Sequence, residues 1–194
     1  MPRGRSDPGP GRESRPPAGL RDRIGPHLRI LFVGINPGIR SAAVGHHFAG
    51  HSNRFWKLLY ESGLVPEAVT WSDDDRLLEW GFGITNLVAR ATPGIGDLHA
   101  SELLAGRRAL EAKVRRYRPA MAALVGVTIY RALFPELARG AAVPLGEAPV
   151  TLAGARVFVL PNPSGRNANY SYAQMLDAFR QLREAVGRRV ATDV

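Results

Sequence analysis

An asparagine framed by glycine and proline is the first residue in this chain whose setting suggests chemistry. Asn36 lies in the segment Gly-Ile-Asn-Pro-Gly at 34–38, directly after an apolar run. Glycine and proline restrict the backbone to an unusual turn and keep bulky side chains away, so the amide can be held rigidly at an open cleft. The segment has neither the glycine spacing of a dinucleotide-binding loop nor the Gly-Lys-Ser/Thr end of a phosphate-binding loop. A structural Asx turn explains Asn36 equally well at this point.

A second loop of similar character follows the last apolar run of the chain. Segment 162–169 reads Asn-Pro-Ser-Gly-Arg-Asn-Ala-Asn, so proline and glycine again shape a loop rich in polar groups. In sheets built from parallel strands, ligands bind beyond the carboxyl ends of the strands. We therefore expect Asn36 and Asn162 to lie at the same edge of a sheet.

A third loop combines histidines with an aromatic side chain. Phe48 lies among His46, His47 and His51, ahead of a helix pattern. No acidic residue joins the histidines, and the loop lacks the helical His-x-x-x-His pair with a carboxylate that typifies one class of zinc site. We predict no metal site here and expect the histidines to be partly exposed loop residues.

Short strand patterns alternate with helix patterns along the chain. The strands are expected at 28–34, 83–88, 121–125, 150–152 and 157–160, and the helices at 53–62, 101–117, 127–134 and 171–188. The helix patterns carry apolar residues on one face, which we interpret as core residues. The alternation predicts an α/β fold, a three-layer α/β/α sandwich with a mainly parallel central sheet.

Length and composition set the class of protein. A chain of 194 residues favours one main domain, expected at 27–190. Lys and Arg number 26 against 17 Asp and Glu, a net charge of +9 that favours a polyanionic partner such as nucleic acid. The chain has no cysteine, which excludes disulfides, cysteine-bound zinc and iron–sulfur clusters. We expect a cytoplasmic protein that needs no metal or other cofactor and does not enter a membrane.

The first 26 residues differ from the rest in composition. They contain six Pro, five Gly and six Arg but few apolar residues that could join a core. Six Arg against Asp7, Glu13 and Asp22 give this stretch +3, which leaves +6 on the remainder. We interpret residues 1–26 as a disordered basic arm, either a solvated tail or a tether to DNA.

Four sequence blocks, in order along the chain, carry a family resemblance. They are Gly-Ile-Asn-Pro-Gly at 34–38, Phe-Ala at 48–49 followed by Asn-Arg-Phe-Trp-Lys at 53–57, Gly-Ile-Thr-Asn-Leu-Val at 83–88, and Leu-Pro-Asn-Pro-Ser-Gly at 160–165. Together they resemble the mismatch-specific uracil-DNA glycosylase family, the bacterial Mug branch related to thymine-DNA glycosylase. Asn36 stands where the main uracil-DNA glycosylase family has a catalytic aspartate. The resemblance implies a uracil-DNA glycosylase-like fold.

The resemblance assigns roles to residues near the two loops. Asn36 is expected to position the water that attacks the anomeric carbon, and Asn162 to assist it; a turn-stabilising amide is the alternative for Asn162. Backbone N–H groups of the 34–41 loop would stabilise the departing base. Phe48 would stack on a flipped base, with anchoring of its loop in the core as the alternative, and Ser41 would line the pocket near the pyrimidine C5. The implied substrate-binding residues are Gly34, Ile35, Gly38, Ser41, Phe48 and Asn86.

The loop after the last strand corresponds to the family's intercalating segment, and here the chain departs from the family. The implied DNA-binding residues are Ser164, Gly165, Arg166, Asn167 and Asn169. Arg166 stands where a leucine wedge is expected, and Ala168-Asn169 replace an expected arginine. An arginine can still stack in the gap and reach guanine acceptors or phosphate.

A second departure is Asn86, because the Mug branch often has lysine at this position. An amide both donates and accepts hydrogen bonds, whereas lysine only donates. We therefore expect uracil activity that depends less on the opposing base.

These patterns predict a monofunctional DNA glycosylase. It would hydrolyse the N-glycosidic bond of uracil in G:U mismatches, and of other altered bases, and leave an abasic site for base excision repair. The expected partner is double-stranded DNA containing uracil or a mismatch, bound by a monomer. The alternatives are a non-catalytic module that binds mismatched or flipped bases, and a nucleotide-binding regulator, which the missing phosphate loop disfavours.

Overall fold

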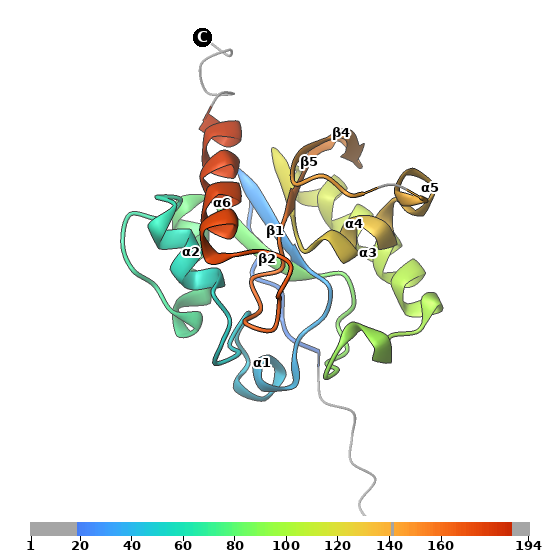
Figure 1. Ribbon diagram of the computed structural model, residues 1–194, viewed down its shortest axis with the longest axis horizontal. Helices are drawn as coiled ribbons and strands as arrows, with labels where there is room; N and C mark the ends of the chain where they lie inside the picture. The colour runs from blue at the N-terminus through green and yellow to red at the C-terminus, as the bar shows by residue number, and fades with distance from the viewer. Residues whose placement is uncertain (1–18, 141, 188–194) are drawn as a thin grey trace, which may run out of the picture.

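A five-stranded sheet lies at the centre of the molecule. The structure is a computed structural model that describes residues 19–140 and 142–187 (Figure 1). The strand order is β2-β1-β3-β5-β4. The strands are β1 (Ile30–Gly34), β2 (Phe82–Asn86), β3 (Met121–Val125), β4 (Gly146–Leu152) and β5 (Ala155–Leu160). All neighbouring strands pair in parallel except β4, which runs antiparallel to β5 at one edge. The prediction of a mainly parallel sheet is confirmed.

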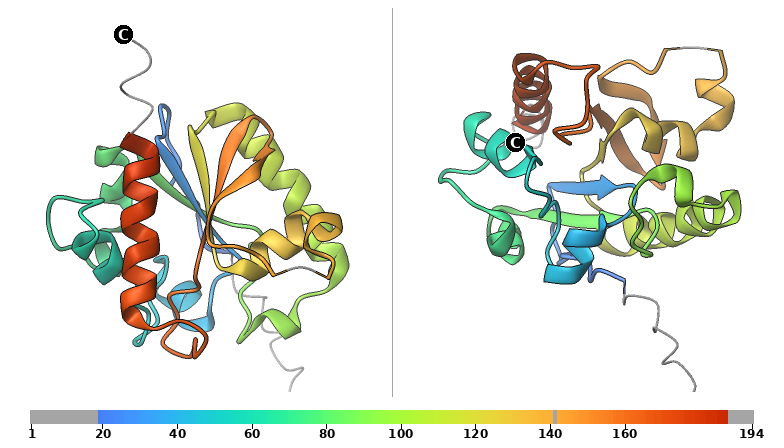
Figure 2. Two further views of the ribbon diagram at one scale, coloured as in Figure 1. Left: turned by 45° about the horizontal axis from the view of Figure 1, so that its top comes forward. Right: turned by 60° about the horizontal axis from the view of Figure 1, so that its bottom comes forward.

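Helices cover both faces of the sheet and complete three layers (Figure 2). One face is covered by α2 (Phe55–Glu61), the 3-10 segment η1 (Trp71–Trp80) and α6 (Tyr172–Gly187). The other is covered by α3 (Ala100–Tyr117) and α4 (Val127–Leu133). Every residue of β1 and β3 is buried, as expected for central parallel strands with helices on both faces.

Short elements account for most differences between the predicted and observed structure. The structure adds α1 (Ile39–Val44), η1, η2 (Ile95–Asp97) and α5 (Pro135–Ala138) in stretches for which the sequence predicts no helix or strand. Each is too short or too polar to show a helical repeat in the sequence. Strand β4 begins at Gly146, earlier than predicted, because an edge strand buries only one face and this one contains Pro149 and a register shift.

Part of the predicted basic arm packs on the domain. The predicted arm residues 1–18 lie outside the described residues, but Arg23 forms an antiparallel bridge with Ile84 of β2. Asp22 accepts hydrogen bonds from the buried Thr85 hydroxyl at 2.6 Å and pairs with Lys113 at 2.6 Å. We call residues 19–23 the N-terminal strap. Its contacts are polar, which explains why a search for apolar residues placed it outside the domain.

A buried carboxylate connects the strap to two other segments. Asp74 in η1 is 0% exposed and accepts hydrogen bonds from Arg23 Nε at 2.9 Å and from the backbone N–H of His47 at 2.8 Å. His46 Nδ1 lies 3.0 Å from the same carboxylate. A buried charge needs such partners, because an unpaired one is costly in free energy. The carboxylate therefore fixes the strap and the loop before α2 relative to η1.

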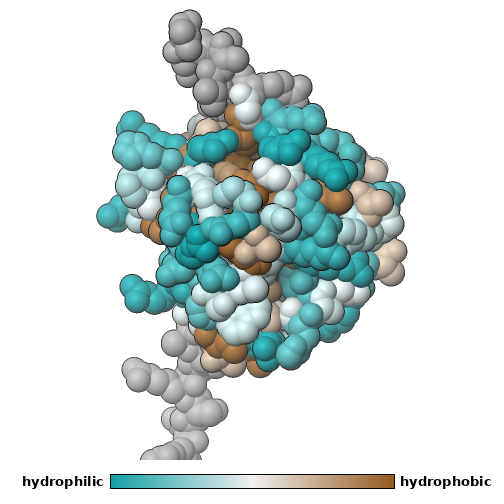
Figure 3. Space-filling model, turned by 90° about the vertical axis from the view of Figure 1, so that its left-hand side faces the viewer, coloured by the Kyte–Doolittle hydropathy of each residue, from teal (hydrophilic) through white to brown (hydrophobic). Residues whose placement is uncertain are grey.

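The face of the molecule shown in Figure 3 is mostly hydrophilic. Large exposed apolar side chains such as Tyr60 and Leu78 are spread over different elements. Scattered apolar residues of this kind are normal on soluble domains. None of the helices at residues 19–140 and 142–187 has the length and apolar character to cross a membrane.

Replacing Arg23 tests the contribution of the strap to stability. Arg23→Ala leaves Asp74 buried without its cationic partner, so we expect a loss of about 3 kcal/mol in the free energy of unfolding. For a chain of this size this lowers the Tm by roughly 6–12 °C. Thermal unfolding monitored by circular dichroism measures the shift. Arg29→Ala, which removes an arginine lying over the Phe82 ring, is the control; an equal loss in both variants would contradict a special role for Arg23.

Candidate functional site

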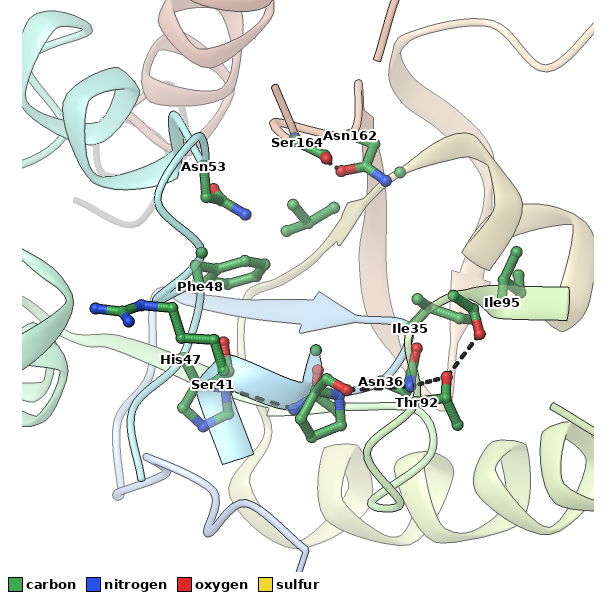
Figure 4. A pocket seen from close by; sticks show the side chains of 18 of the residues that line it. Ile35, Asn36, Ser41, His47, Phe48, Asn53, Thr92, Ile95, Asn162 and Ser164 are labelled. Carbon is green, nitrogen blue, oxygen red and sulfur yellow. Dashed lines mark hydrogen bonds between the residues drawn. The ribbon is translucent and has the colours of Figure 1, made fainter. Parts of the chain in front are cut away.

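A cavity of about 460 Å³ opens at the carboxyl ends of the parallel strands (Figure 4). Its walls come from the segments that follow β1, β2, β3 and β5, and from the loop before α2. The predicted residues that line it are Ile35, Asn36, Gly38, Ser41, Phe48, Asn86, Asn162, Ser164 and Arg166. The two polar loops therefore meet at one edge of the sheet.

Asn36 is held in one orientation by groups from a distant loop. Its Nδ2 donates to Thr92 Oγ1 at 2.8 Å and to the carbonyl oxygen of Arg90 at 3.2 Å. The Thr92 hydroxyl donates its own hydrogen to the Gly94 carbonyl at 2.6 Å, so its oxygen can only accept from Asn36. The amide oxygen Oδ1 must then lie on the opposite side, and Figure 4 shows it directed toward the cavity.

Arg90, whose carbonyl oxygen accepts a hydrogen bond from Asn36, is itself anchored by its side chain. Arg90 forms an ion pair with Glu102 of α3 at 2.7 Å and also donates to the Asp97 carbonyl at 2.7 Å. Hydrogen bonds from Arg90 are the main cause that lowers the pKa of Glu102 to about 2. Glu102 is therefore ionised at neutral pH and can pair with Arg90.

Phe48 forms one wall of the cavity. It stacks on Phe55 of α2, with ring centroids 4.1 Å apart and an angle of 24° between the rings. Its backbone has φ of 52°, the left-handed region, which is unusual for a bulky residue and often marks a functional site. One face of the ring is thus anchored in the core while the side chain also lines the cavity (Figure 4), so anchoring and base stacking are compatible roles.

Asn162 stabilises a turn and also lines the cavity. Its Oδ1 accepts from the backbone N–H of Ser164 at 3.0 Å, which is the turn-stabilising arrangement. The Nδ2 is directed into the cavity in Figure 4. Gly126 faces it with a φ of 131°, and a Cβ at this glycine would lie 3.5 Å from Asn162 Cβ. Glycine is needed here for its backbone conformation, because a Cβ would make only an ordinary van der Waals contact with Asn162.

Ser41 is buried and fixes the loop that carries Phe48. Its Oγ accepts from the backbone N–H of Ala49 at 3.0 Å, and Arg40 Nε donates to the carbonyl of the same residue at 2.8 Å. Ser41 also lines the cavity. The loop before α2 is therefore tied to α1 as well as to Asp74.

Four of the predicted site residues do not line the cavity. Gly34 packs beneath Asn86, and Gly165 packs against Ser52. Asn167 and Asn169 stabilise their own loop: Asn167 Nδ2 donates to the Asn162 carbonyl at 2.8 Å, and its Oδ1 accepts from the Asn169 N–H at 3.0 Å. These residues shape the loop whose Ser164 and Arg166 reach the cavity.

Several wall residues were not singled out by the sequence. The expectation of partly exposed histidines is wrong for His47, which lines the cavity and is only 1% exposed. Its burial lowers its pKa below the usual value. No local sequence pattern links Thr92 to Asn36, which lies 56 residues away. Ile39 and Ile95 line the cavity while remaining largely exposed, so they lie at its rim.

The charges of the cavity are all positive. Arg40 and Arg166 line it, and no Asp or Glu is among its lining residues in the part of the chain that the structure describes. No three His, Asp or Glu side chains come together as metal ligands at residues 19–140 and 142–187. The site offers oriented amides, an aromatic ring and positive charge, which together can hold a planar, hydrogen-bonding ring that acquires negative charge.

The structure is thus an α/β protein with a polar cavity at the carboxyl ends of its parallel strands. Comparison with known proteins identifies the family. A model of the Uracil DNA glycosylase superfamily matches residues 22–185. The chain belongs to this superfamily, and is accordingly a DNA glycosylase, a hydrolase that acts on DNA.

A solved structure shows the same fold. The solution NMR structure of a "putative Uracil DNA glycosylase" from Methanosarcina acetivorans is similar, with a TM-score of 0.55 and 17% sequence identity. The match covers 86% of this chain and 98% of that chain. The two proteins therefore share their architecture over nearly the whole of the Methanosarcina protein.

The close packing of Gly165 predicts that even a methyl group disturbs the loop after β5. A Cβ at this position would lie 2.7 Å from the backbone oxygen of Ser52, which has little room to move. We expect Gly165→Ala to cost about 1–3 kcal/mol or to displace the loop, with weaker DNA binding. Thermal unfolding and fluorescence anisotropy with a labelled duplex measure both effects. Gly96→Ala, which meets no atom within 4 Å, is the control, and equal behaviour of the two variants would contradict the prediction.

Proposed function

We propose that this protein is a monofunctional uracil-DNA glycosylase of the mismatch-specific Mug branch. It hydrolyses the N-glycosidic bond of uracil in G:U mismatches, and of other altered bases, and leaves an abasic site for base excision repair. The observation that carries the proposal is the fixed orientation of Asn36, whose Oδ1 faces the cavity while its Nδ2 is held by Thr92 and Arg90.

An oriented amide suits water-assisted cleavage of the bond. Oδ1 can accept a hydrogen bond from a water molecule and so direct the oxygen of that water at the anomeric carbon. An amide is too weak a base to remove a proton early, so the glycosidic bond must break first through an oxocarbenium-like state. The base then leaves as an anion. Backbone N–H groups of the 34–41 loop and the positive charge of Arg40 favour that departure.

Recognition of a flipped base is supported by the shape of the site. A cavity of about 460 Å³ falls within the range typical of small-molecule sites. Phe48, supported by Phe55, provides a platform for stacking, which contributes roughly 1–3 kcal/mol per base. Flipping a nucleotide out of the duplex costs least at mismatched pairs, so uracil in a G:U pair is a suitable substrate. Arg166 at the cavity is placed to enter the gap in the duplex or to contact phosphate.

The positions of the two lysines support the proposal that the enzyme removes the base and leaves the DNA strand intact. Strand cleavage by a glycosylase uses an amine that forms a Schiff base. The chain has two lysines, Lys57 and Lys113, and neither lines the cavity. Lys57 lies 3.5 Å from Glu61 and Lys113 pairs with Asp22. We further propose that the protein acts as a monomer, since one chain supplies every wall of the cavity described above. We also propose a cytoplasmic location, which the absence of cysteine from the chain favours.

The direct test uses a labelled duplex with one uracil opposite guanine, followed by alkali cleavage. Wild-type protein is expected to give an abasic product, and Asn36→Ala to lower the single-turnover rate by roughly 10²-fold or more, because the water is no longer positioned. If wild-type protein binds the duplex but forms no abasic product, it is a non-catalytic reader of flipped bases. Full activity of Asn36→Ala would remove the role given to Asn36.

Thr92→Val tests the orientation of the amide separately. Valine keeps the shape of threonine but loses the oxygen that accepts from Asn36, so the amide can turn. We expect about a tenfold lower single-turnover rate with little change in DNA affinity, the effect of one hydrogen bond of about 1.4 kcal/mol. Thr151→Val on the exposed edge strand is the control. A Thr92→Val enzyme as fast as wild type would show that Asn36 is oriented by other groups.

Asn86 and Arg166 lead us to expect broad activity toward uracil. Asn86 replaces the lysine, and Arg166 the leucine wedge, that are typical of the Mug branch. We therefore expect binding of the DNA to depend less on a guanine opposite the uracil. Single-turnover rates should be comparable for uracil opposite guanine, opposite adenine and in single strands. Strict dependence on guanine would refute this expectation.

A further inference from the structure

Two exposed isoleucines at the rim of the cavity have no role in the mechanism above. Ile39, the first residue of α1, is 53% exposed, and Ile95, the first residue of η2, is 40% exposed. Both line the cavity. The other large apolar side chains that are exposed at residues 19–140 and 142–187 do not line it; they are Tyr60, Leu78, Leu104 and Leu137. Exposed apolar surface gathered beside a binding cavity is typical of an interaction site.

The segments that carry the two isoleucines are hydrogen-bonded to each other. The backbone N–H of Thr92 donates to the Pro37 carbonyl at 3.2 Å, and Asn36 Nδ2 donates to Thr92 Oγ1 at 2.8 Å. Ile39 and Ile95 therefore extend from one connected part of the rim. We call the two side chains together the apolar lip.

Hydrogen bonds also hold the turn that carries Ile95 in place. The backbone N–H of Gly94 donates to Asp97 Oδ2 at 3.1 Å. Arg90, which is ion-paired with Glu102, donates to the Asp97 carbonyl at 2.7 Å. A side chain on a preorganised turn loses little conformational freedom on binding, so its contacts contribute more to affinity.

The rest of the rim indicates what the apolar lip contacts. Arg166 lines the cavity from the loop after β5, and no Asp or Glu lines it in the part of the chain that the structure describes. Figure 4 shows Ile95 across the cavity from Phe48 and Asn53. The rim therefore combines positive charge with exposed apolar surface. A duplex from which one nucleotide has flipped offers partners for both, namely phosphates and the faces of the base pairs beside the gap.

We propose that Ile39 and Ile95 form an apolar lip that packs against the base pairs beside the flipped nucleotide. The inference rests on the proposed function, because a flipped nucleotide is what exposes those base faces at the rim. Apolar side chains, isoleucine among them, commonly pack against base steps that have been opened. The loop after β5 has no Leu, Ile, Val, Met or aromatic residue at 162–169, so the apolar contact comes from the other side of the cavity. By removing base faces from water, the lip favours the flipped state.

Duplex binding tests the lip without any excision of a base. The probe is a fluorescently labelled duplex with one tetrahydrofuran abasic-site analogue opposite guanine, and anisotropy with the full chain gives the Kd. We expect Ile39→Ala and Ile95→Ala each to weaken binding about tenfold, because less apolar surface is removed from water. Affinity for the labelled single strand should stay unchanged, since it has no stacked base pair beside the analogue.

A matched control is available on α5. Leu137 is 57% exposed and does not line the cavity, so Leu137→Ala should leave both affinities unchanged. Ile95→Leu retains apolar surface and should recover most of the duplex affinity that Ile95→Ala loses. The replaced side chains are all largely exposed, so each variant is expected to keep the Tm of the wild-type protein. An equal loss of duplex affinity in Leu137→Ala would overturn the proposal.

The salt dependence of binding distinguishes contact with bases from contact with phosphates. Each lost phosphate contact lowers the slope of log affinity against log salt by about 0.9. We expect Ile95→Ala to keep the wild-type slope, whereas Arg166→Ala, which removes a positive charge, should lower it. A lower slope in Ile95→Ala would show that the residue acts on phosphate contacts, contrary to the proposal.

The remaining outcomes separate the lip from the proposed function. Equal affinity of the wild-type protein and the double variant Ile39→Ala/Ile95→Ala for the analogue duplex would overturn the lip. So would a wild-type protein that binds the analogue duplex no better than an undamaged one, because the lip would then have no gap to cover. If the lip variants bind the analogue duplex more weakly but the wild-type protein does not excise uracil, the proposed function fails and the lip stands.

Discussion

The carboxylate of Asp74, fully buried in η1, connects three parts of the chain that are distant in sequence. A charge in this position is tolerated only when hydrogen-bond donors surround it, and here Arg23, His46 and the backbone of His47 do so. The arginine brings the N-terminal strap to the edge of β2. The two histidines bring the loop that carries Phe48 to the inner wall of the cavity. Much of the site is thereby positioned by a residue that does not touch it.

A second constraint is the orientation of amide side chains. Asparagine has a donor and an acceptor at nearly equivalent positions, so its chemistry depends on which end faces the ligand. Asn36 is oriented by Thr92, whose hydroxyl hydrogen is already used by the Gly94 carbonyl. Asn162 is oriented by the backbone N–H of Ser164. The cavity thus presents fixed polar atoms although no carboxylate lines it in the described part of the chain.

Most of the positive charge of the chain lies outside the cavity. The net charge of +9 comes from residues spread over the chain, which suits sequence-independent attraction to phosphates. The residues that face the cavity are mostly neutral, apart from Arg40 and Arg166.

The sequence by itself determined the layers of the fold and the location of the site. Strands such as β3 are short apolar runs buried on both faces, a pattern set by neighbouring residues, and parallel strands bring Asn36 and Asn162 to one edge. Only the tertiary structure decided which atoms of these amides face the cavity. Thr92 lies 56 residues from Asn36, and Arg23 lies 51 residues from Asp74. Polar contacts over such separations leave no periodic pattern, because they depend on where the packed elements bring single atoms together.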